Sequence, residues 1–204
     1  MSSIQYAEFK SRPFYGVLKP APALAHLIVA EGEGAQAVME LVAKAPDDFT
    51  SQATLLYAEG PYSPNNGNTQ ALRELGFARF HTSATAAAAL PRLNGTLERL
   101  RMGTEVYLTG NESALSLFVK ACTDAGLDYQ GLQTEHRGSL ARRVQCVHCK
   151  GITENVTTQP ATCAHCGLLL LVRDHYSRRI GAFQGVNINA EDPSDIPAKE
   201  EMFS

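Results

Sequence analysis

Four of the five cysteines in this 204-residue chain form two Cys-x-x-Cys pairs, and this arrangement constrains the fold more than any other feature. The pairs are Cys146 with Cys149 and Cys163 with Cys166, and thirteen residues separate them. At this spacing, two tight turns can bring four thiolates onto one tetrahedral metal ion. Gly167, directly after the second pair, can take the positive φ that such a turn often needs. The sequence therefore predicts a closed four-sulfur zinc ribbon, whose metal contributes folding free energy and not catalysis.

Other interpretations of the cysteines remain open. Disulfides are disfavoured because the chain starts Met-Ser-Ser-Ile, with no basic and apolar leader that would indicate export to an oxidising compartment. A rubredoxin-like iron centre uses the same four thiolates and would make the ribbon a one-electron carrier. His148 and His165 lie inside the pairs, but four cysteines already complete a tetrahedron. Cys122 stands alone in an apolar helical stretch and is expected to be a buried small hydrophobe.

Length and hydrophobic content bound the number of domains. A chain of 204 residues with 44% hydrophobic content can bury one ordinary core and carry a small additional module. No apolar run approaches the roughly 20 residues that a membrane span requires, so no membrane partner is expected. Together with the missing leader, this predicts a cytoplasmic protein.

The charges are unevenly distributed around a net charge of -3. Residues 1–136 carry ten Lys/Arg against fourteen Asp/Glu, residues 137–180 carry seven against two, and the remainder carries one against five. Six cations of the ribbon region could neutralise phosphates, namely Arg142, Arg143, Lys150, Arg173, Arg178 and Arg179. However, the main domain is acidic and no aromatic residues suited to base stacking are interleaved with these cations. We therefore expect no nucleic-acid partner.

The first 136 residues alternate apolar strand-like runs with helical segments, which indicates an α/β domain with a parallel sheet. The expected strands are 24–30, 54–58, 77–81, 105–109 and 129–134. Helical spacing marks residues 35–43 and 113–125, with Gly126 placed to end the second helix. Residues 82–101 are also expected to be helical, with an interruption near Pro91 and Asn94-Gly95.

Two glycine-containing turns, 30–34 and 109–112, follow predicted strands at the position where α/β sheets usually bind ligands. In order and spacing, residues 24–135 resemble the nicotinamide-binding half of ferredoxin reductases. Glu31 and Glu33 depart from that family because they flank Gly32, where a pyrophosphate would be repelled. Only about twenty residues precede Leu24, too few for the family's flavin barrel. We expect a degenerate domain without nucleotide binding, although a contribution to an NADPH site and an ordinary α/β scaffold remain alternatives.

After the ribbon, residues 168–172 form an apolar strand-like run that leads into Arg-Asp-His-Tyr-Ser-Arg-Arg at 173–179. Asp174, His175 and Ser177 are the residue types of a nucleophilic triad, but adjacency in sequence does not supply triad geometry. Arg and Tyr are enriched where proteins dock, so an interface is the better interpretation of this segment.

The motifs from Cys146 to Val186 carry a closer resemblance. They read Cys-Val-His-Cys-Lys-Gly-Ile-Thr, Cys-Ala-His-Cys-Gly, Leu-Val-Arg-Asp-His-Tyr-Ser-Arg-Arg and Ala-Phe-Gln-Gly-Val. Together with the reductase-like domain before them, they resemble the small subunit of bacterial dimethylamine monooxygenases. The resemblance implies a multi-subunit, NADPH-dependent oxygenase of methylated amine metabolism. In it, a flavin and iron–sulfur reductase subunit passes electrons to a haem subunit that demethylates a secondary amine.

These observations predict three regions and a supporting role. The regions are a degenerate ferredoxin-reductase-like domain at 1–138, a zinc ribbon with an Arg-rich docking segment at 139–186, and an acidic flexible tail at 187–204. The chain has no flavin barrel, no evident haem-ligand motif and too few cysteines for a separate iron–sulfur cluster. We therefore expect neither flavin nor haem on this chain. The predicted role is that of a non-catalytic subunit that assembles or positions the reductase and haem subunits.

Overall fold

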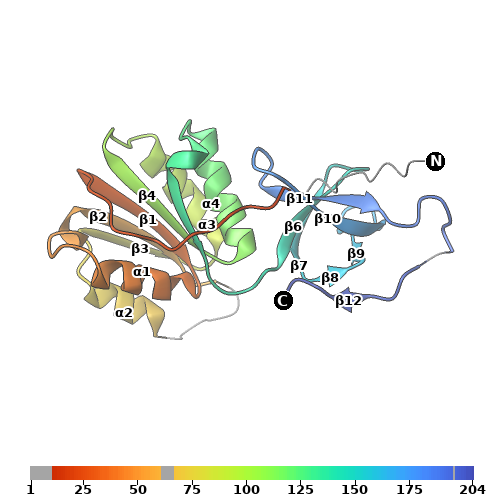
Figure 1. Cartoon of the computed structure of the whole chain (residues 1–204), viewed down its shortest axis with the longest axis horizontal. Helices are drawn as coiled ribbons and strands as arrows, with labels where there is room; N and C mark the ends of the chain where they lie inside the picture. Colours follow the sequence, from red (N-terminus) through yellow and green to blue (C-terminus); the bar gives the residue numbers. More distant parts are fainter. Residues whose placement is uncertain (1–10, 61–66, 195) are drawn as a thin grey trace, which may run out of the picture.

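A computed structural model describes residues 11–60, 67–194 and 196–204 of the chain, and it divides into an α/β domain and a smaller, strand-rich domain (Figure 1). The α/β domain is built on a five-stranded sheet in the order β3-β2-β1-β4-β5, and every neighbouring pair is parallel. Its strands are β1 (Ala25–Glu31), β2 (Ala53–Ala58), β3 (Arg79–Ser83), β4 (Thr104–Gly110) and β5 (Leu132–His136). The predicted parallel α/β sheet is therefore confirmed, with all five strands within a few residues of their expected positions.

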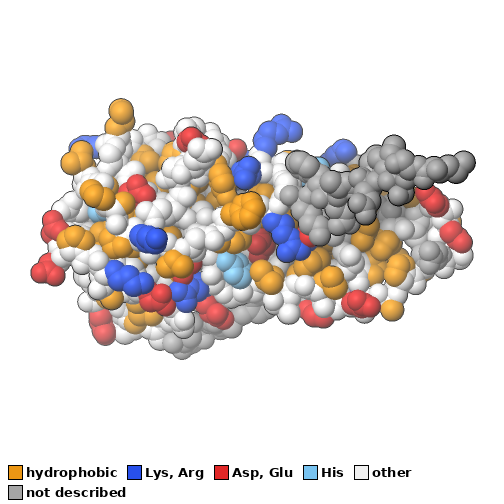
Figure 2. Space-filling model, in the orientation of Figure 1, with side chains coloured by type: hydrophobic (Ala, Val, Ile, Leu, Met, Phe, Trp, Pro, Cys, Tyr) orange, Lys and Arg blue, Asp and Glu red, His pale blue; other side chains and the backbone are white. Residues whose placement is uncertain are grey.

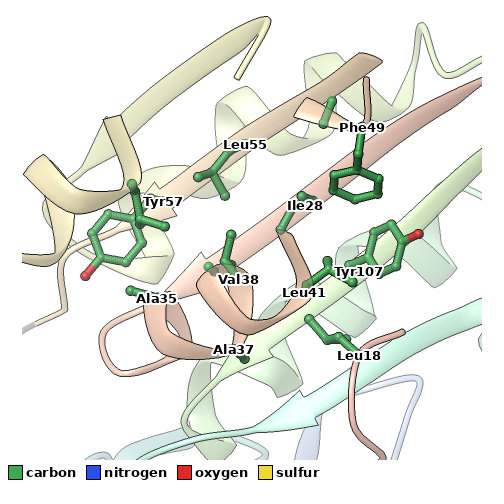
Figure 3. Packing of buried hydrophobic residues seen from close by; sticks show 13 residues of the cluster. Leu18, Ile28, Ala35, Ala37, Val38, Leu41, Phe49, Leu55, Tyr57 and Tyr107 are labelled. Carbon is green, nitrogen blue, oxygen red and sulfur yellow. The ribbon is translucent and has the colours of Figure 1, made fainter. Parts of the chain in front are cut away.

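Helices cover both faces of this sheet, because alternate residues of each strand point to opposite sides. The helices are α1 (Gly34–Ala43), α2 (Asn68–Glu74), α3 (Ala86–Leu97) and α4 (Glu112–Asp124), and short 3-10 turns lie at Thr50–Gln52 and Tyr129–Gly131. Ile28 and Leu55 pack with Val38 of α1 in one core (Figure 3). Leu27 and Val106, on the other face, pack with the helices α3 and α4. The result is a three-layer α/β/α domain.

The helix α3 differs from the expectation of an interrupted segment. It runs without a break from Ala86 to Leu97, with Pro91 inside it. Proline costs the helix one backbone hydrogen bond. The Thr85 side chain accepts a bond from the Ala88 amide at 3.1 Å and caps the start of the helix, and Leu93 and Leu97 are buried along one face. Tertiary packing therefore outweighs the local signal of the proline.

The smaller domain is a five-stranded sheet in the order β7-β6-β11-β10-β9. Its strands are β6 (Arg142–Cys146), β7 (Ile152–Val156), β9 (Ala161–Thr162), β10 (Leu169–Ser177) and β11 (Ala182–Asn187). The pair β6 and β11 is parallel, whereas the other pairs are antiparallel. Val144, Leu170 and Phe183 form its separate small core.

The end of the acidic segment 187–204 differs from the expected flexible tail. Residues Glu200–Glu201 form β12, which pairs antiparallel with β8 (Thr158–Gln159). The amides of Met202 and Phe203 both donate to the Thr157 carbonyl at 2.8 Å, and the Phe203 side chain is 6% exposed. Phe203 thus anchors the end of a segment that has few core-forming residues.

The N-terminal segment ties the two domains together. The Ser11 amide donates to the Asp174 carbonyl of β10 at 3.0 Å, whereas the Gly16 amide donates to the Thr134 carbonyl of β5 at 2.8 Å. The Leu18 amide continues this contact by donating to a carboxylate oxygen of Glu135 at 2.7 Å. No helix in the described part of the chain is long and apolar enough to cross a bilayer.

Candidate functional site

The two Cys-x-x-Cys turns have the same backbone geometry. In the first, the Lys150 amide donates to the Cys146 carbonyl at 2.9 Å, and in the second the Gly167 amide donates to the Cys163 carbonyl at 3.0 Å. Lys150 and Gly167 both have positive φ, 62° and 74°, so the expected left-handed conformation of Gly167 is confirmed. Lysine at the equivalent position bears a strain that glycine avoids. Both turns therefore present their sulfurs in the same way.

The four sulfurs converge on one point. The Sγ atoms of Cys146, Cys149, Cys163 and Cys166 all lie within 4.8 Å of one another. The Cys146 and Cys166 sulfurs are 3.8 Å apart, and those of Cys149 and Cys163 are 3.6 Å apart. A regular tetrahedron with metal–sulfur bonds of about 2.3 Å places its sulfurs about 3.8 Å from each other. The donor set and its spacing therefore fit a four-coordinate metal ion.

Burial and hydrogen bonds set the pKa values of these thiols. Burial opposes ionisation of Cys163, but the amides of Cys166 and His165 outweigh it and lower the pKa of this thiol to about 6. The amide of Leu168 favours the Cys166 thiolate, yet burial and the three other thiols raise its pKa to about 12. Four thiolates this close together therefore need a cation to become fully ionised.

The other candidate ligands of the sequence lie apart from the four sulfurs. His165 places Nε2 2.9 Å from the Ile152 carbonyl, and His148 is exposed at its turn. Cys122 is fully buried in the α/β core, and burial raises the pKa of its thiol to about 12. Its predicted role as a small hydrophobe is confirmed. The cysteine cluster is consequently a closed four-sulfur arrangement among the described residues.

The crevice at the carboxyl ends of β1 and β4 is small and acidic. Its lining includes Glu31, Glu33 and Glu59, and its volume is about 100 Å³. Pockets that hold drug-sized ligands have roughly 300–1,000 Å³. Gly138, from the connection between the domains, lies against Glu33, so the connection borders the crevice. Both size and charge oppose the binding of a dinucleotide phosphate here.

Glu31 is a buried carboxylate in the wall of this crevice. Its carboxylate accepts from the backbone amide of Asn111 at 3.3 Å and from the Asn111 side chain at 3.2 Å. A Cβ atom on Gly60 would lie 2.4 Å from a Glu31 oxygen, so the glycine leaves room for the carboxylate. Burial raises the pKa of Glu31, a shift that Asn111 opposes and Glu33 reinforces. The glycine turns thus enclose a side chain of the protein itself.

Much of the Arg-rich segment 173–179 contacts the rest of the chain. Asp174 accepts from Arg12 at 2.5 Å and from Arg142 at 2.9 Å. Burial opposes ionisation of Asp174, but these two hydrogen bonds outweigh it and hold the pKa of the carboxyl below its usual value. Arg178 lies 4.2 Å from the ring centre of Tyr129 in the α/β domain. Only Arg173 and Arg179 of the segment's arginines remain exposed without such a contact among the described residues.

The sequence did not predict that Arg142 is buried. Its guanidinium carbon lies 4.1 Å from the ring centre of Phe183 and 4.0 Å from that of Phe203, so two aromatic rings enclose it. Burial lowers the pKa of Arg142, and Asp174 opposes this shift. Arg143 is also buried and bonds Glu154 at 2.9 Å. Arg142 and Arg143 were both counted as potential phosphate ligands, but both are buried in the small domain.

A buried polar cluster lies at the start of α4, near the junction of the domains. The Tyr15 hydroxyl donates to Glu112 at 2.7 Å, and the His136 ring stacks on Tyr15 with centroids 5.8 Å apart. Glu112 is 5% exposed, and burial raises the pKa of its carboxyl. No sequence pattern indicated this cluster, because its members come from three distant segments.

Comparison with known proteins gives one relative of described activity. The chain is 33% identical over 101 residues to the heme-dependent oxidative N-demethylase delta subunit of Ectopseudomonas mendocina (strain ymp), a match that covers 50% of this chain and 58% of that relative. The chain thus matches little more than half of the relative's length.

Solved structures show more distant likenesses. Phthalate dioxygenase reductase has 10% identity and a TM-score of 0.45, covering 71% of this chain and 47% of its own. The flavohem-like FAD/NAD-binding domain of nitric oxide dioxygenase from Vibrio cholerae O1 biovar El Tor has 17% identity and a TM-score of 0.37, covering 63% of this chain and 56% of its own.

Two family models together span most of the chain. Residues 7–132 match the N-terminal domain of the dimethylamine monooxygenase subunit DmmA-like family, and residues 143–186 match the C-terminal domain of the same family. The first match contains the α/β sheet through the start of β5, and the second contains all four clustered cysteines. The chain therefore belongs to the dimethylamine monooxygenase subunit DmmA-like family.

Proposed function

We propose that this chain is a non-catalytic subunit of a multi-subunit oxygenase that oxidatively demethylates a secondary amine such as dimethylamine. Its role is to assemble or position a reductase subunit and a haem subunit, in keeping with its family and with the delta-subunit relative. The observation that carries this proposal is a pair of features: the closed four-sulfur cluster of the small domain, and the volume of only about 100 Å³ of the crevice in the α/β domain. The first feature supports a structural role, and the second disfavours a nicotinamide site on this chain.

The proposed metal is zinc, with Cys146, Cys149, Cys163 and Cys166 as its ligands. Four thiolates in a tetrahedron form a structural zinc site without an open position for water or substrate. When bound, the ion supplies folding free energy to the small domain. Cys146 ends β6 and Cys163 follows β9, so the site joins two strands that are not neighbours in the sheet. The other residues of the small domain shape the ribbon and form its outer surface.

The second candidate function is that of a rubredoxin-like electron carrier with iron in the same cluster. Its support is the incomplete burial of the cluster, because Cys149 and Cys166 are not buried, whereas Cys146 and Cys163 are. Sulfur donors at this spacing do not discriminate between zinc and iron. The two functions differ in metal content and colour.

The decisive experiment purifies the chain after coexpression with the other subunits and measures metals and the absorption spectrum. One zinc per chain in a colourless, co-purifying subunit is the expected result. Iron at the same stoichiometry, with a thiolate charge-transfer band that bleaches on reduction, would instead establish the carrier function. A chain that never co-purifies with the other subunits would refute both functions.

A matched pair of variants tests the structural role of the metal. Cys146→Ser removes one ligand and is expected to abolish zinc retention and complex formation, because the ribbon depends on the metal for folding. Cys122→Ala removes the fifth cysteine, which lies in the other domain. This control should retain both the metal and the complex. Normal assembly of the Cys146→Ser variant would contradict the proposal.

A further inference from the structure

A basin lined by arginines lies at the amino-terminal edge of the parallel sheet, opposite the carboxyl edge that holds the acidic crevice. Its volume is about 650 Å³, and the beginnings of β1 to β4 and the last turns of α3 surround it. We call the group formed by Arg79, Arg92, Arg99 and Arg101 the arginine basin. Four of the ten cations in the first 136 residues gather here, although that region is acidic overall.

No described carboxylate forms a salt bridge with any of these four cations. No described Asp or Glu lines the cavity either. Burial lowers the pKa of His26 at the margin, and Glu105 and Asp48 oppose this shift. Burial lowers the pKa of His81 inside the basin, and Arg92 and Arg79 lower it further. The local field is therefore strongly positive.

The helix α3 explains only a part of this gathering. Arg99 and Arg101 follow its last residue, Leu97, where a helix end favours cations. Arg92 is earlier in the helix and lines the same cavity as Arg99. Arg79 comes from β3, an independent element. Three separate parts of the chain thus contribute like charges that repel one another.

Exposed hydrophobic side chains border the basin. Leu24 and Met102 are 82% and 97% exposed, and Leu24 packs beside Gly103, directly after Met102. Figure 2 shows hydrophobic side chains projecting at the end of the α/β domain furthest from the small domain. Cations around exposed apolar residues are typical of protein interfaces, where Arg and Met are enriched.

We infer that the arginine basin is a docking surface for a carboxylate-rich surface of another subunit of the oxygenase complex. This inference rests on the proposed function and places the contact on the α/β domain, far from the ribbon. Acidic side chains of the partner neutralise the four arginines, and an apolar residue of the partner covers Leu24 and Met102. Charge pairing of this kind sets the association rate and the choice of partner.

The exposure of the arginines favours a protein partner over a small anion. All four side chains are exposed, whereas a small-molecule site holds its polar groups in fixed positions. The buried polar side chain at the margin is His26, whose Nδ1 lies 3.4 Å from the Tyr107 hydroxyl. The basin thus offers charge without a fixed geometry, which suits a broad acidic surface.

Charge reversal in the coexpressed complex tests this inference. Arg92→Glu with Arg99→Glu is expected to weaken binding of the chain to the remaining subunits at least about tenfold at low salt, because like charges then face each other. The control, Lys19→Glu with Lys44→Glu, makes the same change in net charge at two exposed positions outside the basin. The affinity of the wild-type chain should fall as salt rises, and the reversed chain should show a weaker salt dependence.

Several outcomes would overturn the inference. The inference would be wrong if the basin variant and the control bound the other subunits with equal affinity. It would also be wrong if the basin variant lost self-association of the chain and kept its binding to the other subunits. Salt-sensitive binding of an RNA or DNA oligonucleotide that the basin variant alone loses would assign the basin to nucleic acid. If Cys146→Ser disrupts the complex and the basin variant does not, only this inference fails. If neither variant binds less well than wild type, the proposed function fails with it.

Discussion

Replacing Phe203 by alanine should detach the C-terminal residues from the small domain. The Phe203 side chain is 6% exposed and packs over the guanidinium of Arg142 at 4.0 Å. Burial of a phenylalanine contributes about 1.5–3 kcal/mol, and a partly desolvated cation–π contact contributes about 0.5–2 kcal/mol. Because the site borders an open cavity of about 300 Å³, water can refill the space, and we expect a loss of about 2–4 kcal/mol.

Amide hydrogen exchange measures this loss locally. The amides of Met202 and Phe203 donate to Thr157, so they exchange only when the segment opens. A loss of about 2–4 kcal/mol corresponds to a fall in protection of roughly 30- to 1,000-fold. Met202→Ala is the matched control, since its side chain is 52% exposed and its removal should cost less than about 0.5 kcal/mol.

Two results would refute this reasoning. Unprotected amides at 202 and 203 in the wild-type chain would mean that β12 does not pair with β8. Equal protection in the Phe203→Ala and Met202→Ala variants would mean that the aromatic ring does not hold the segment.

Three further predictions concern the cysteines, the glycines and the buried carboxylates. A thiol reagent at pH 8 should modify no cysteine rapidly in the metal-loaded chain, four cysteines after metal removal, and all five after unfolding. The fifth, Cys122, reacts only after unfolding because burial raises the pKa of its thiol to about 12. Rapid reaction of a fifth thiol in the folded chain would contradict the burial of Cys122. Gly34→Ala should destabilise the chain by about 1–3 kcal/mol in urea unfolding, because the new Cβ would lie 2.9 Å from the backbone of Thr109. Gly95→Ala should instead stabilise α3 by about 0.5–1 kcal/mol, because its Cβ would meet only the Arg99 side chain, at 3.7 Å. A change of the same sign in the unfolding free energy of both variants would contradict this reasoning. Burial raises the folded-state pKa of Glu112, so its favourable contribution is complete below about pH 4.5 and declines as pH rises through that raised pKa. The unfolding free energy of Glu112→Gln relative to wild type should therefore increase from pH 5 to pH 7, and a constant difference would show that Glu112 titrates normally.

The local features of this chain were predictable where short-range rules decide them. Gly167 takes a left-handed turn, and Gly126 ends α4 with a φ of 90°, since both positions need a conformation that glycine adopts without strain. The three central strands β1, β2 and β4 were predictable because buried parallel strands are continuous apolar runs. The interruption at Pro91 was not a reliable inference, because burial of one helix face offsets the lost hydrogen bond.

The candidate sites, too, were predictable only where their residues lie close together in the sequence. The four cysteines are close in sequence, so their spacing alone indicated that one metal ion could join them, and the sulfurs do converge. The two carboxylates beside Gly32 were recognisable as hostile to a pyrophosphate, but only the fold shows Glu31 occupying the crevice. The arginine basin joins residues from β3 and α3 with a following loop, and no periodicity relates them.

The sequence by itself determined the class of the α/β domain, the turns of the ribbon and the acidic character of the glycine crevice. These properties depend on residue type, spacing and backbone preference over a few positions. Only the tertiary structure decided the pairing of Asp174 with Arg12 and Arg142, the packing of Phe203 over Arg142, and the gathering at one edge of the sheet of four arginines that pair with no described carboxylate. Those contacts join residues far apart along the chain, and their free energy exists only after the two cores have formed and excluded water.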